Sequence, residues 1–393
     1  MDHDHDDDPL AGLSVALAHW HSDAWGGAEY LVTKLAAALD LDVIHTIGQP
    51  EPEASNPFGD VEWVDVTGGP ADAVRRRFGR AAEYALWEDV DWRTHGDPDI
   101  LLTSGSTTRA VLPPDDTLAV NYCHSPPRWL YDLYHDRKGS LLGTLARPAV
   151  RYFRLRDQSI DPRVDAYLAN SPVIQRRLWK YYKRESTVLY PPLELESYSR
   201  SRSHSGFYLH LGRLEAEKGV PAIVEAFEGR PERLRFAGGR GDVGAALDRI
   251  RRAPNMSYLG FVDEGDKHDL LANCRAVVFN GVAEDFGIVP IEANASGKPC
   301  LARNDGFPGL FIEDGHNGLL HDGTAAGIRR ALDRIEELDP GAVDFGSLVE
   351  PFSIDTFERR LRETLAAEYG RLRDRFDAPD PDKYGRLDAE TRR

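Results

Sequence analysis

The 393-residue sequence is poor in cysteine and has no long apolar run. Its three cysteines, Cys123, Cys274 and Cys300, cannot all pair and show no zinc-binding spacing, which favours a reducing environment. The absence of any apolar run of roughly 18 residues excludes a conventional transmembrane helix. The N-terminal stretch 1–8 is acidic, whereas a secretory signal begins with positive charge. Together these absences predict a cytoplasmic protein.

Positive charge is also scarce. Lys and Arg number 48 against 65 Asp and Glu, so the net charge is −17 at pH 7, which argues against a nucleic-acid partner. Arginine supplies most of the positive charge, and Asp outnumbers Glu. Such a surface is typical of halophilic cytosolic proteins, whose self-repulsion is screened by salt. The alternative is an ordinary acidic protein from a GC-rich genome.

Apolar runs alternate with helical periodicity in two successive blocks. The first block predicts a helix over 28–39 and strands over 13–18, 42–47, 100–104, 118–123 and 164–170. The second predicts helices over 220–227 and 288–296, a helix ending at 252, and strands over 207–211, 234–237, 257–261, 276–280 and 299–303. Strands alternating with helices indicate parallel sheets with crossover helices.

The two blocks predict an α/β protein of two Rossmann-like domains. We expect an N-terminal domain over 9–190, a C-terminal domain over 191–350, a helix over 351–376 that packs back on the N-terminal domain, and a disordered tail over 377–393. Ser353 is the expected N-cap of that helix. Ligands of open parallel sheets bind beyond the carboxyl ends of the strands. The chemistry is therefore expected in the loops after the strands, facing a central cleft.

The loop after the first strand of each block carries residues suited to anions. Gly26 and Gly27 precede a helix whose free N–H groups and positive dipole end attract phosphate or a hydroxyl, although a plain tight turn explains them equally well. In the second block, Arg213 and Lys218 lie in the loop that follows the first strand. They can donate charge-assisted hydrogen bonds to a diphosphate. A solvated loop with neighbouring glutamates is the alternative there.

The stretch 284–292 is the most informative part of the sequence. Glu284 lies in a loop, and Glu292 lies in the second turn of the helix expected to begin near Gly287. Glu292 can accept hydrogen bonds from a ribose, and Glu284 from a sugar. The backbone N–H groups at the helix start can hold hydroxyls or phosphate; they belong to Phe286, Gly287, Ile288 and Val289. Two carboxylates near a helix start also stabilise its dipole without any function.

His124 follows a strand of the first block, and Pro126 and Pro127 stiffen the chain after it. A lone histidine is more often structural than catalytic. Its position at a strand end, where parallel sheets bind ligands, favours a role in the chemistry.

Taken together and in this order, these residues resemble the retaining glycosyltransferases of family 4, whose GT-B fold has two Rossmann-like domains facing a cleft. The resemblance covers about residues 11–375 and is most specific in the blocks 212–219 and 284–292. The segments 122–126 and 284–290 look most like O-antigen-type mannosyltransferases that use GDP-mannose. The residues that resemble the family's segment between the domains are Asn170, Ser171, Tyr182, Tyr190, Pro191 and Pro192.

The resemblance implies that four residues act in the reaction. His124 would contact the donor sugar on its reacting face. Arg213 and Lys218 would bind the diphosphate and stabilise the charge of the leaving group. Glu284 would hold sugar hydroxyls. By the same resemblance the departing diphosphate oxygen is the base that takes the acceptor's proton.

The resemblance also implies how the donor is bound. Glu292 would bind the ribose, and the backbone of 286–289 would supply hydrogen-bond donors. Gly26 and Gly27 would let the backbone approach phosphate or acceptor. The family needs no metal, because cations take over the charge that a metal would supply. No cofactor is therefore expected.

Two departures from the family pattern stand out. A proline that is common before the first motif glutamate is absent from 280–283, and the loop 305–310 has no glutamate near Gly309. They weaken inferences about the fine structure of donor or acceptor binding. They do not affect the class of reaction.

The implied function is the transfer of a hexose, by likeness mannose, from a nucleotide diphosphate sugar to a hydroxyl of a growing glycan. That glycan is expected on a polyprenyl lipid. A UDP- or ADP-sugar transferase acting on a soluble acceptor is one alternative, and a non-catalytic sugar-nucleotide-binding assembly subunit is another. The basic and aromatic segment 176–184 suits peripheral contact with the inner face of an anionic membrane. We favour the alternative interpretation, in which the segment 176–184 is a solvated helix near the domain junction.

Overall fold

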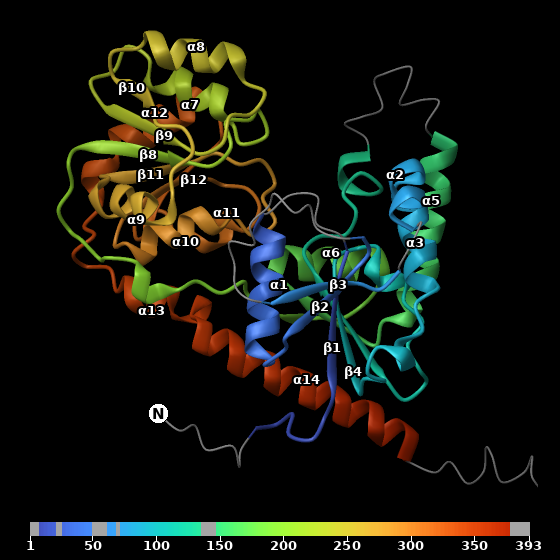
Figure 1. Ribbon diagram of the computed structural model, residues 1–393. Coiled ribbons are helices and arrows are strands. Elements are labelled where there is room, and N and C mark those ends of the chain that lie inside the picture. The colour runs from blue at the N-terminus through green and yellow to red at the C-terminus, as the bar shows by residue number, and fades with distance from the viewer. Residues whose placement is uncertain (1–7, 21–25, 49–60, 68–70, 135–146, 378–393) are drawn as a thin grey trace, which may run out of the picture. The chain divides into compact units, whose positions relative to one another are not determined.

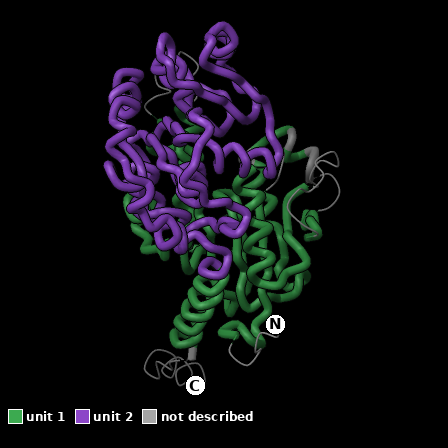
Figure 2. Tube along the Cα trace, turned by 90° about the vertical axis from the view of Figure 1, so that its left-hand side faces the viewer, with its two compact units in different colours: residues 1–169, 177–189, 358–393 green, residues 170–176, 190–357 purple. Residues whose placement is uncertain are grey.

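The computed structural model describes residues 8–20, 26–48, 61–67, 71–134 and 147–377 (Figure 1). The chain forms two compact units, coloured separately in Figure 2. The first unit comprises residues 1–169, 177–189 and 358–393, and the second comprises 170–176 and 190–357. Each unit is built on one parallel sheet, which confirms the predicted α/β fold of two Rossmann-like domains. The predicted domain limits, 9–190 and 191–350, stay predictions.

The sheet of the first unit has seven strands in the order β3-β2-β1-β4-β5-β6-β7, and every pair is parallel. Because β1 lies between β2 and β4, the strand order reverses there, and ligands of such sheets bind at this point. The strands are β1 Val15–His19, β2 Val43–Thr46, β3 Glu62–Asp65, β4 Ile100–Ser104, β5 Leu118–Cys123, β6 Ala166–Ala169 and β7 Thr187–Val188. Every residue of β4 and β5 is buried, which explains why most of their residues are apolar.

The core of the first unit gathers around Trp87 and Trp92, which are fully buried against residues of β1 and β4. The helices of this unit are α1 Gly27–Ala38, α2 Ala71–Phe78, α3 Arg80–Glu88 and α5 Arg147–Ile160, together with α14 Ile354–Asp377 from residue 358 onward. Short 3₁₀ turns lie at Trp92–Thr94, Thr108–Ala110, Asp132–Tyr134 and Asp161–Arg163. Helix α6, Pro172–Tyr182, begins in the second unit's segment and ends in the first's.

Helix α14 is the C-terminal helix expected over 351–376. The Ser353 hydroxyl accepts a hydrogen bond from the Thr356 N–H at 3.2 Å, which confirms the predicted N-cap. The predicted disordered tail, 377–393, lies outside the described residues except for Asp377 at the end of the helix.

Polar contacts hold α14 against the first unit. Arg362 donates to the carbonyl of Ala38 at 2.9 Å and to the carboxylate of Asp8 at 2.8 Å. About two turns further along the helix, the Tyr369 hydroxyl donates to Asp99 at 3.2 Å. Residues far apart in the sequence are thereby brought into one unit.

The sheet of the second unit has six parallel strands in the order β10-β9-β8-β11-β12-β13. Its strand order reverses between β8 and β11. The strands are β8 Phe207–Leu211, β9 Arg233–Ala237, β10 Met256–Tyr258, β11 Ala276–Phe279, β12 Cys300–Arg303 and β13 Gly318–His321. The helices are α7 Val220–Phe227, α8 Gly244–Arg252, α9 Glu264–Asn273, α10 Ile288–Ala295, α11 Pro308–Phe311, α12 Ala325–Asp333 and α13 Phe345–Val349, with 3₁₀ turns at Leu195–Ser197, Ile335–Glu337 and Glu350–Phe352.

Two further sequence expectations can be compared with the structure. Cys123, Cys274 and Cys300 are all buried free thiols. Over the part of the chain that the structure describes, no helix is both long enough and apolar enough to cross a membrane.

Candidate functional site

Three strands of the first unit end in polar side chains that meet at the reversal of the sheet. His19 ends β1, Ser104 ends β4, and His124 follows β5. The Ser104 hydroxyl lies 3.0 Å from His19 Nδ1 and 2.8 Å from His124 Nε2. One hydroxyl therefore links the two imidazoles. His124 lies where the sequence predicted it, at a strand end.

A carboxylate from the first turn of α1 completes this group. Glu29 Oε1 lies 3.6 Å from His19 Nε2, and Glu29, His19 and Ser104 are all buried. Burial alone raises the pKa of Glu29, but the hydrogen bond and charge of His19 and the backbone of Glu29 and Gly26 hold that pKa below its usual value. We call Glu29, His19, Ser104 and His124 the histidine cluster.

The imidazole of His124 is held in its neutral form. Burial, and then the charge of His19, lower the pKa of His124 to about 3, although Glu29 acts in the opposite direction. The ring stacks on Trp20, with centroids 6.2 Å apart. His124 is thus suited to offer or accept a hydrogen bond, and unsuited to carry a charge at neutral pH.

The predicted glycines mark the start of α1. Gly26 is its N-cap and Gly27 its first residue. The backbone of Gly26 is extended, with φ −154°, so the turn itself does not require a glycine. A Cβ on Gly26 would lie 3.3 Å from a Glu29 oxygen, and on Gly27 it would meet open space. Their predicted role in approaching phosphate or acceptor stays a prediction.

The second unit gathers its predicted cations and carboxylate beyond β8 and β11, at the reversal of its sheet. Lys218 Nζ lies 2.8 and 3.1 Å from the two carboxylate oxygens of Glu284. The Arg213 guanidinium pairs with Glu215 at 3.0 Å, and its side chain is 69% exposed. Arg213 can therefore turn toward an anion at little cost, whereas Lys218 and Glu284 hold each other in place.

The backbone around Glu284 is fixed by the loop after β12. The Phe307 N–H donates to the Glu284 carbonyl at 3.0 Å, and the Ala283 N–H donates to the Asp305 carboxylate at 2.9 Å. Gly306 has φ +62°, and a Cβ there would lie 2.2 Å from the Glu284 carbonyl oxygen. Only glycine fits this approach, so the loop 305–310, noted as a departure from the family pattern, supports Glu284 through its backbone.

Helix α10 begins as the sequence predicted. Its N-cap, Gly287, has a left-handed backbone with φ 67°, and among the described residues no side chain caps this start. The Phe286 side chain is buried, with its ring stacked on Phe307 at 5.3 Å. The predicted contribution of 286–289, including Ile288 and Val289, is therefore one of backbone N–H groups.

Glu292 is a buried carboxylate with two protein partners. Its Oε1 accepts from the Tyr198 hydroxyl at 2.9 Å and from Lys267 Nζ at 2.8 Å. Burial lowers the pKa of Lys267, but the charges and hydrogen bonds of Glu292 and Glu264 outweigh it and leave that pKa raised. The predicted role of Glu292 toward a ribose stays a prediction. We call Arg213, Lys218, Glu284 and Glu292, with the start of α10, the glutamate cluster.

Sequence reasoning overlooked the partners of the predicted residues. They are His19, Glu29 and Ser104 in the first unit and Tyr198 and Lys267 in the second. A strand-end histidine and serine, and a glutamate directly after a glycine pair, are the signals that were present for the first three. Nothing local in the sequence marks Tyr198 or Lys267.

The basic segment 176–184 forms most of α6 and the turn after it. Trp179 is 58% exposed, and Lys183 lies over its ring at 4.4 Å. Arg177 pairs with Asp132 at 3.4 Å. Part of the segment's charge is thus used within the first unit, and the predicted membrane contact stays a prediction.

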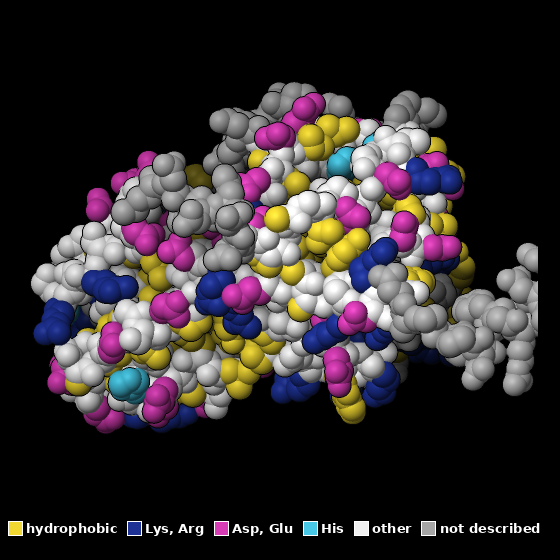
Figure 3. Space-filling view, turned by 90° about the horizontal axis from the view of Figure 1, so that it is seen from below, with side chains coloured by type: hydrophobic (Ala, Val, Ile, Leu, Met, Phe, Trp, Pro, Cys, Tyr) yellow, Lys and Arg dark blue, Asp and Glu magenta, His cyan; other side chains and the backbone are white. Residues whose placement is uncertain are grey.

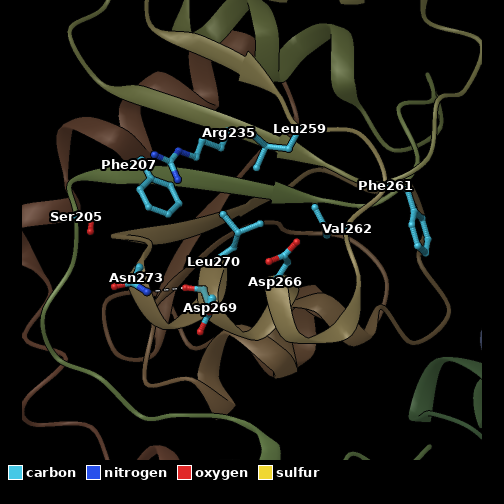
Figure 4. Close-up of a pocket in the computed structure, with 10 residues that line it drawn as sticks. All are labelled: Ser205, Phe207, Arg235, Leu259, Phe261, Val262, Asp266, Asp269, Leu270 and Asn273. Carbon is cyan, nitrogen blue, oxygen red and sulfur yellow. Dashed lines mark hydrogen bonds between the residues drawn. The ribbon is translucent and has the colours of Figure 1, made fainter.

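A groove of about 480 Å³ lies apart from the predicted residues, along β8, β9 and α9 (Figure 4). In it, the Arg235 guanidinium lies 4.1 Å from the centroid of the Phe207 ring, and Asp266 and Leu270 project from α9 (Figure 4). None of the sequence-predicted residues lines this groove.

Comparison with known proteins adds a family match to this geometry. Residues 196–347 match the sequence model of the family "Glycosyl transferases group 1". The chain is 25% identical over 263 residues to an alpha-1,3/1,6-mannosyltransferase ALG2 of Dictyostelium discoideum, covering 54% of this chain and 60% of that protein. It is 29% identical over 201 residues to a D-inositol 3-phosphate glycosyltransferase of Corynebacterium glutamicum, covering 43% and 48%. The chain thus spans about half to three fifths of the length of these curated relatives.

Solved structures resemble the fold over almost the whole chain. Anabaena HepE, solved in complex with UDP and glucose, superposes with a TM-score of 0.69 and 17% identity over 90% of this chain and all of that one. A sucrose-phosphate synthase of Thermosynechococcus elongatus superposes with a TM-score of 0.65 and 18% identity over 93% and 99%. At these identities the likeness establishes the two-domain fold.

Proposed function

We propose that this chain, whose residues 196–347 match the sequence model of the group 1 glycosyl transferases, is a retaining glycosyltransferase of family 4. It transfers a hexose from a nucleotide diphosphate sugar to a hydroxyl of a glycan. One observation carries the proposal: the glutamate cluster lies inside the residues that match the family, at the strand ends where the sheet reverses.

The charges of the glutamate cluster fit the departure of a nucleotide diphosphate. Arg213 is exposed and pairs with Glu215 at the surface, so a diphosphate can replace that partner. Lys218 adds a second positive charge 2.8 Å from Glu284. Negative charge grows on the diphosphate as the bond to the sugar breaks, and fixed cations stabilise that state more than the ground state.

Glu284 places a sugar-binding carboxylate beside the same cation. Held by Lys218 and by the backbone of the 305–310 loop, it can accept sugar hydroxyls without reorganising. The departing diphosphate oxygen then takes the acceptor's proton on the face that the bond has left. Attack from that face retains the configuration at the anomeric carbon.

Mannose from GDP-mannose is the donor we favour, and a polyprenyl-linked glycan is the acceptor. The support is the likeness to an alpha-1,3/1,6-mannosyltransferase, together with the sequence resemblance of 122–126 and 284–290. A protein without a membrane-crossing helix among its described residues would reach such an acceptor at the membrane surface.

A UDP-sugar donor with a soluble acceptor is the second candidate. The structure of HepE with UDP and glucose and the likeness to a D-inositol 3-phosphate glycosyltransferase favour it. Both candidates use the same glutamate cluster. They differ in the nucleotide base and the acceptor.

A donor screen separates the candidates. The protein is incubated with GDP-mannose, UDP-glucose or UDP-N-acetylglucosamine, with a lipid extract or a soluble sugar as acceptor, and transfer is followed by mass spectrometry. We expect transfer from GDP-mannose to the lipid fraction, and its loss in Glu284→Gln. Transfer from a UDP-sugar alone supports the second candidate. Nucleotide binding without turnover of any donor indicates a non-catalytic subunit.

A further inference from the structure

We propose that Asn280 is a positioning residue, whose side-chain amide holds Lys218 in place beside Glu284. Asn280 begins the segment 280–283, from which a proline that is common in the family pattern is absent. The inference rests on the proposed function, in which Lys218 stabilises the departing diphosphate. It adds how this chain fixes the position of that cation.

The Asn280 amide connects three loops of the second unit. Its side chain is 1% exposed and follows directly on β11. Nδ2 donates to the carbonyl of Gly219 at 3.2 Å and to the carbonyl of Gly323 at 3.1 Å. Carbonyl oxygens only accept, so both contacts come from the NH₂ group, and they fix the orientation of the amide. One side chain thereby joins the loops that follow β8, β11 and β13.

Lys218 lies between two backbone carbonyls that the loop after β11 holds. Before the lysine, the Val282 N–H donates to the carbonyl of Glu217 at 3.1 Å. After the lysine, the Asn280 amide holds the carbonyl of Gly219. The chain on both sides of Lys218 is therefore tied to the same loop that carries its carboxylate partner.

The backbone at Gly219 is shaped for this contact. Gly219 is the N-cap of α7, with φ +67°, and a Cβ there would lie 2.4 Å from Asn280 Nδ2. Its carbonyl also accepts from the N–H groups of Ala222 and Ile223, both at 3.2 Å, in the first turn of α7. The bond from Asn280 thus orients the carbonyl with which the helix begins, and its loss frees the turn that carries Lys218.

A fixed backbone matters more for Lys218 than for the other cation of the glutamate cluster. The Arg213 side chain is 69% exposed and can follow the diphosphate, whereas the Lys218 side chain is 29% exposed and is held by Glu284. Negative charge develops on the diphosphate as the bond to the sugar breaks, and a cation already in place stabilises it without reorganising. Displacing the turn of Lys218 should therefore act on turnover.

The position of Lys218 can be followed in the ligand-free protein by amine labelling. The protein is treated with trace acetic anhydride, and mass spectrometry gives the acetylated fraction of each lysine. Asn280→Leu keeps the branched shape of the side chain and removes both donors, and Asn280→Ala removes the shape as well. In both variants Lys218 should label about threefold faster, because its ion pair with Glu284 loosens, and Lys267 should label as in the wild type.

Asn255 offers a matched control in the same unit. Its Nδ2 donates to three backbone carbonyls at and beyond the end of α7 that lies away from Lys218, those of Phe227 (2.9 Å), Arg230 (3.1 Å) and Glu232 (2.9 Å). Asn255→Leu should lower the melting temperature without changing the labelling of Lys218 or kcat. Wild-type labelling of Lys218 in Asn280→Leu, or an equal change in Asn255→Leu, overturns the proposal.

A double-variant cycle tests whether Asn280 acts through Lys218. With the donor found in the screen, Asn280→Leu should lower kcat about tenfold with little change in donor KM, because the cation is misplaced in the reacting state. Combined with Lys218→Met, the same change should have little further effect, since no charge is left to position. A further loss of about tenfold in that background would show that Asn280 acts elsewhere.

Labelling and kinetics together separate this inference from the proposed function. If Lys218 labels as expected and no donor is turned over, the positioning role stands and the proposed function fails. If transfer occurs and Asn280→Leu matches the wild type in both labelling and kcat, the proposed function stands and the positioning role fails.

Discussion

At the scale of the residue, the two motif glutamates differ in their surroundings. Glu284 is partly exposed and pairs with Lys218, whereas Glu292 is buried and accepts hydrogen bonds from Tyr198 and Lys267. Removing the Glu292 carboxylate altogether takes the buried partner from the charged Lys267 and leaves it the exposed Glu264, a change that lowers stability. A glutamine, which keeps the size and one acceptor oxygen, is therefore the better test of function.

The first prediction separates the roles of the two glutamates. Glu292→Gln should weaken binding of free nucleotide and donor alike by roughly tenfold, because both carry the ribose. Glu284→Gln should leave free nucleotide binding nearly unchanged and lower turnover, because the sugar must be held while charge develops at its anomeric carbon. Isothermal titration with GDP and UDP, and a transfer assay, measure both effects. Equal losses of free nucleotide affinity in the two variants would show that the roles are wrongly assigned.

The second prediction concerns metal. Because Arg213 and Lys218 bring the positive charge that a leaving diphosphate requires, turnover should persist in EDTA. Lys218→Met, which keeps most of the length of the side chain without the charge, should lower turnover by about a hundredfold or more. A rate that vanishes with EDTA and returns with Mg²⁺ or Mn²⁺ contradicts the prediction.

The sequence predicted loop residues better than it predicted their partners. His124, Arg213, Lys218 and Glu284 are recognisable because each follows a strand. The contacts that link the site residues to their partners are long-range. His19 and Ser104, for example, are separated by 85 positions. Such a pairing depends on the order of strands in the sheet, which local periodicity does not contain.

At the scale of the element, two loops after neighbouring strands form one support. The loop after β11 contains Glu284, and the loop after β12 contains Asp305, Gly306 and Phe307, which bond to it or pack against its backbone. Because the contact is made by backbone atoms, a Cβ at Gly306 displaces the carboxylate without touching it. The position of Glu284 is therefore set by a residue that no motif includes.

The third prediction tests this support with two glycines. Gly306→Ala and Gly315→Ala both place a side chain on a left-handed backbone, φ +62° and +85°, which costs about 1 kcal/mol of stability in each. A Cβ at 315 meets nothing within 4 Å, whereas at 306 it lies 2.2 Å from the Glu284 carbonyl oxygen. Gly306→Ala should therefore lower kcat at least tenfold, and Gly315→Ala should not. Thermal melts and transfer rates measured on both variants decide, and equal rates would contradict the proposed support.

Strands buried on both faces were predicted best. The limits of β4, β5 and β8 agree with the predicted 100–104, 118–123 and 207–211. The prediction of 257–261 was wrong at its end, because β10 stops at Tyr258 and Gly260 turns the chain with φ +81°.

Three strands lacked a clear local signal. The sheet-edge strands β3, β7 and β13 were missed. The first two are short and only partly buried, so their residues show no apolar run, and β13 begins with a glycine. Pairing with a neighbouring strand, which the sequence pattern does not show, defines them as strands.

At the scale of the whole molecule, charge is the dominant surface property. On the face drawn in Figure 3, Asp and Glu side chains lie among Lys and Arg side chains. Many arginines are paired with carboxylates, among them Arg249 with Glu228 and Arg334 with Asp314. Exposed pairs of this kind contribute about 0–1 kcal/mol each to stability and weaken in salt. The excess of carboxylates remains, since the net charge is −17.

The fourth prediction follows from the competition between these two effects. Salt weakens the surface pairs, but it also screens the mutual repulsion of the unpaired carboxylates, and the second effect acts over the whole surface. If the acidic, lysine-poor surface is a halophilic adaptation, the melting temperature should rise as KCl increases toward molar concentrations. The double variant Asp115→Asn, Asp116→Asn removes two adjacent exposed carboxylates, so it should melt higher than the wild type in low salt and gain less from KCl. A melting temperature that stays flat or falls with KCl, or a variant with the wild-type salt dependence, would show that self-repulsion does not limit the stability of this chain.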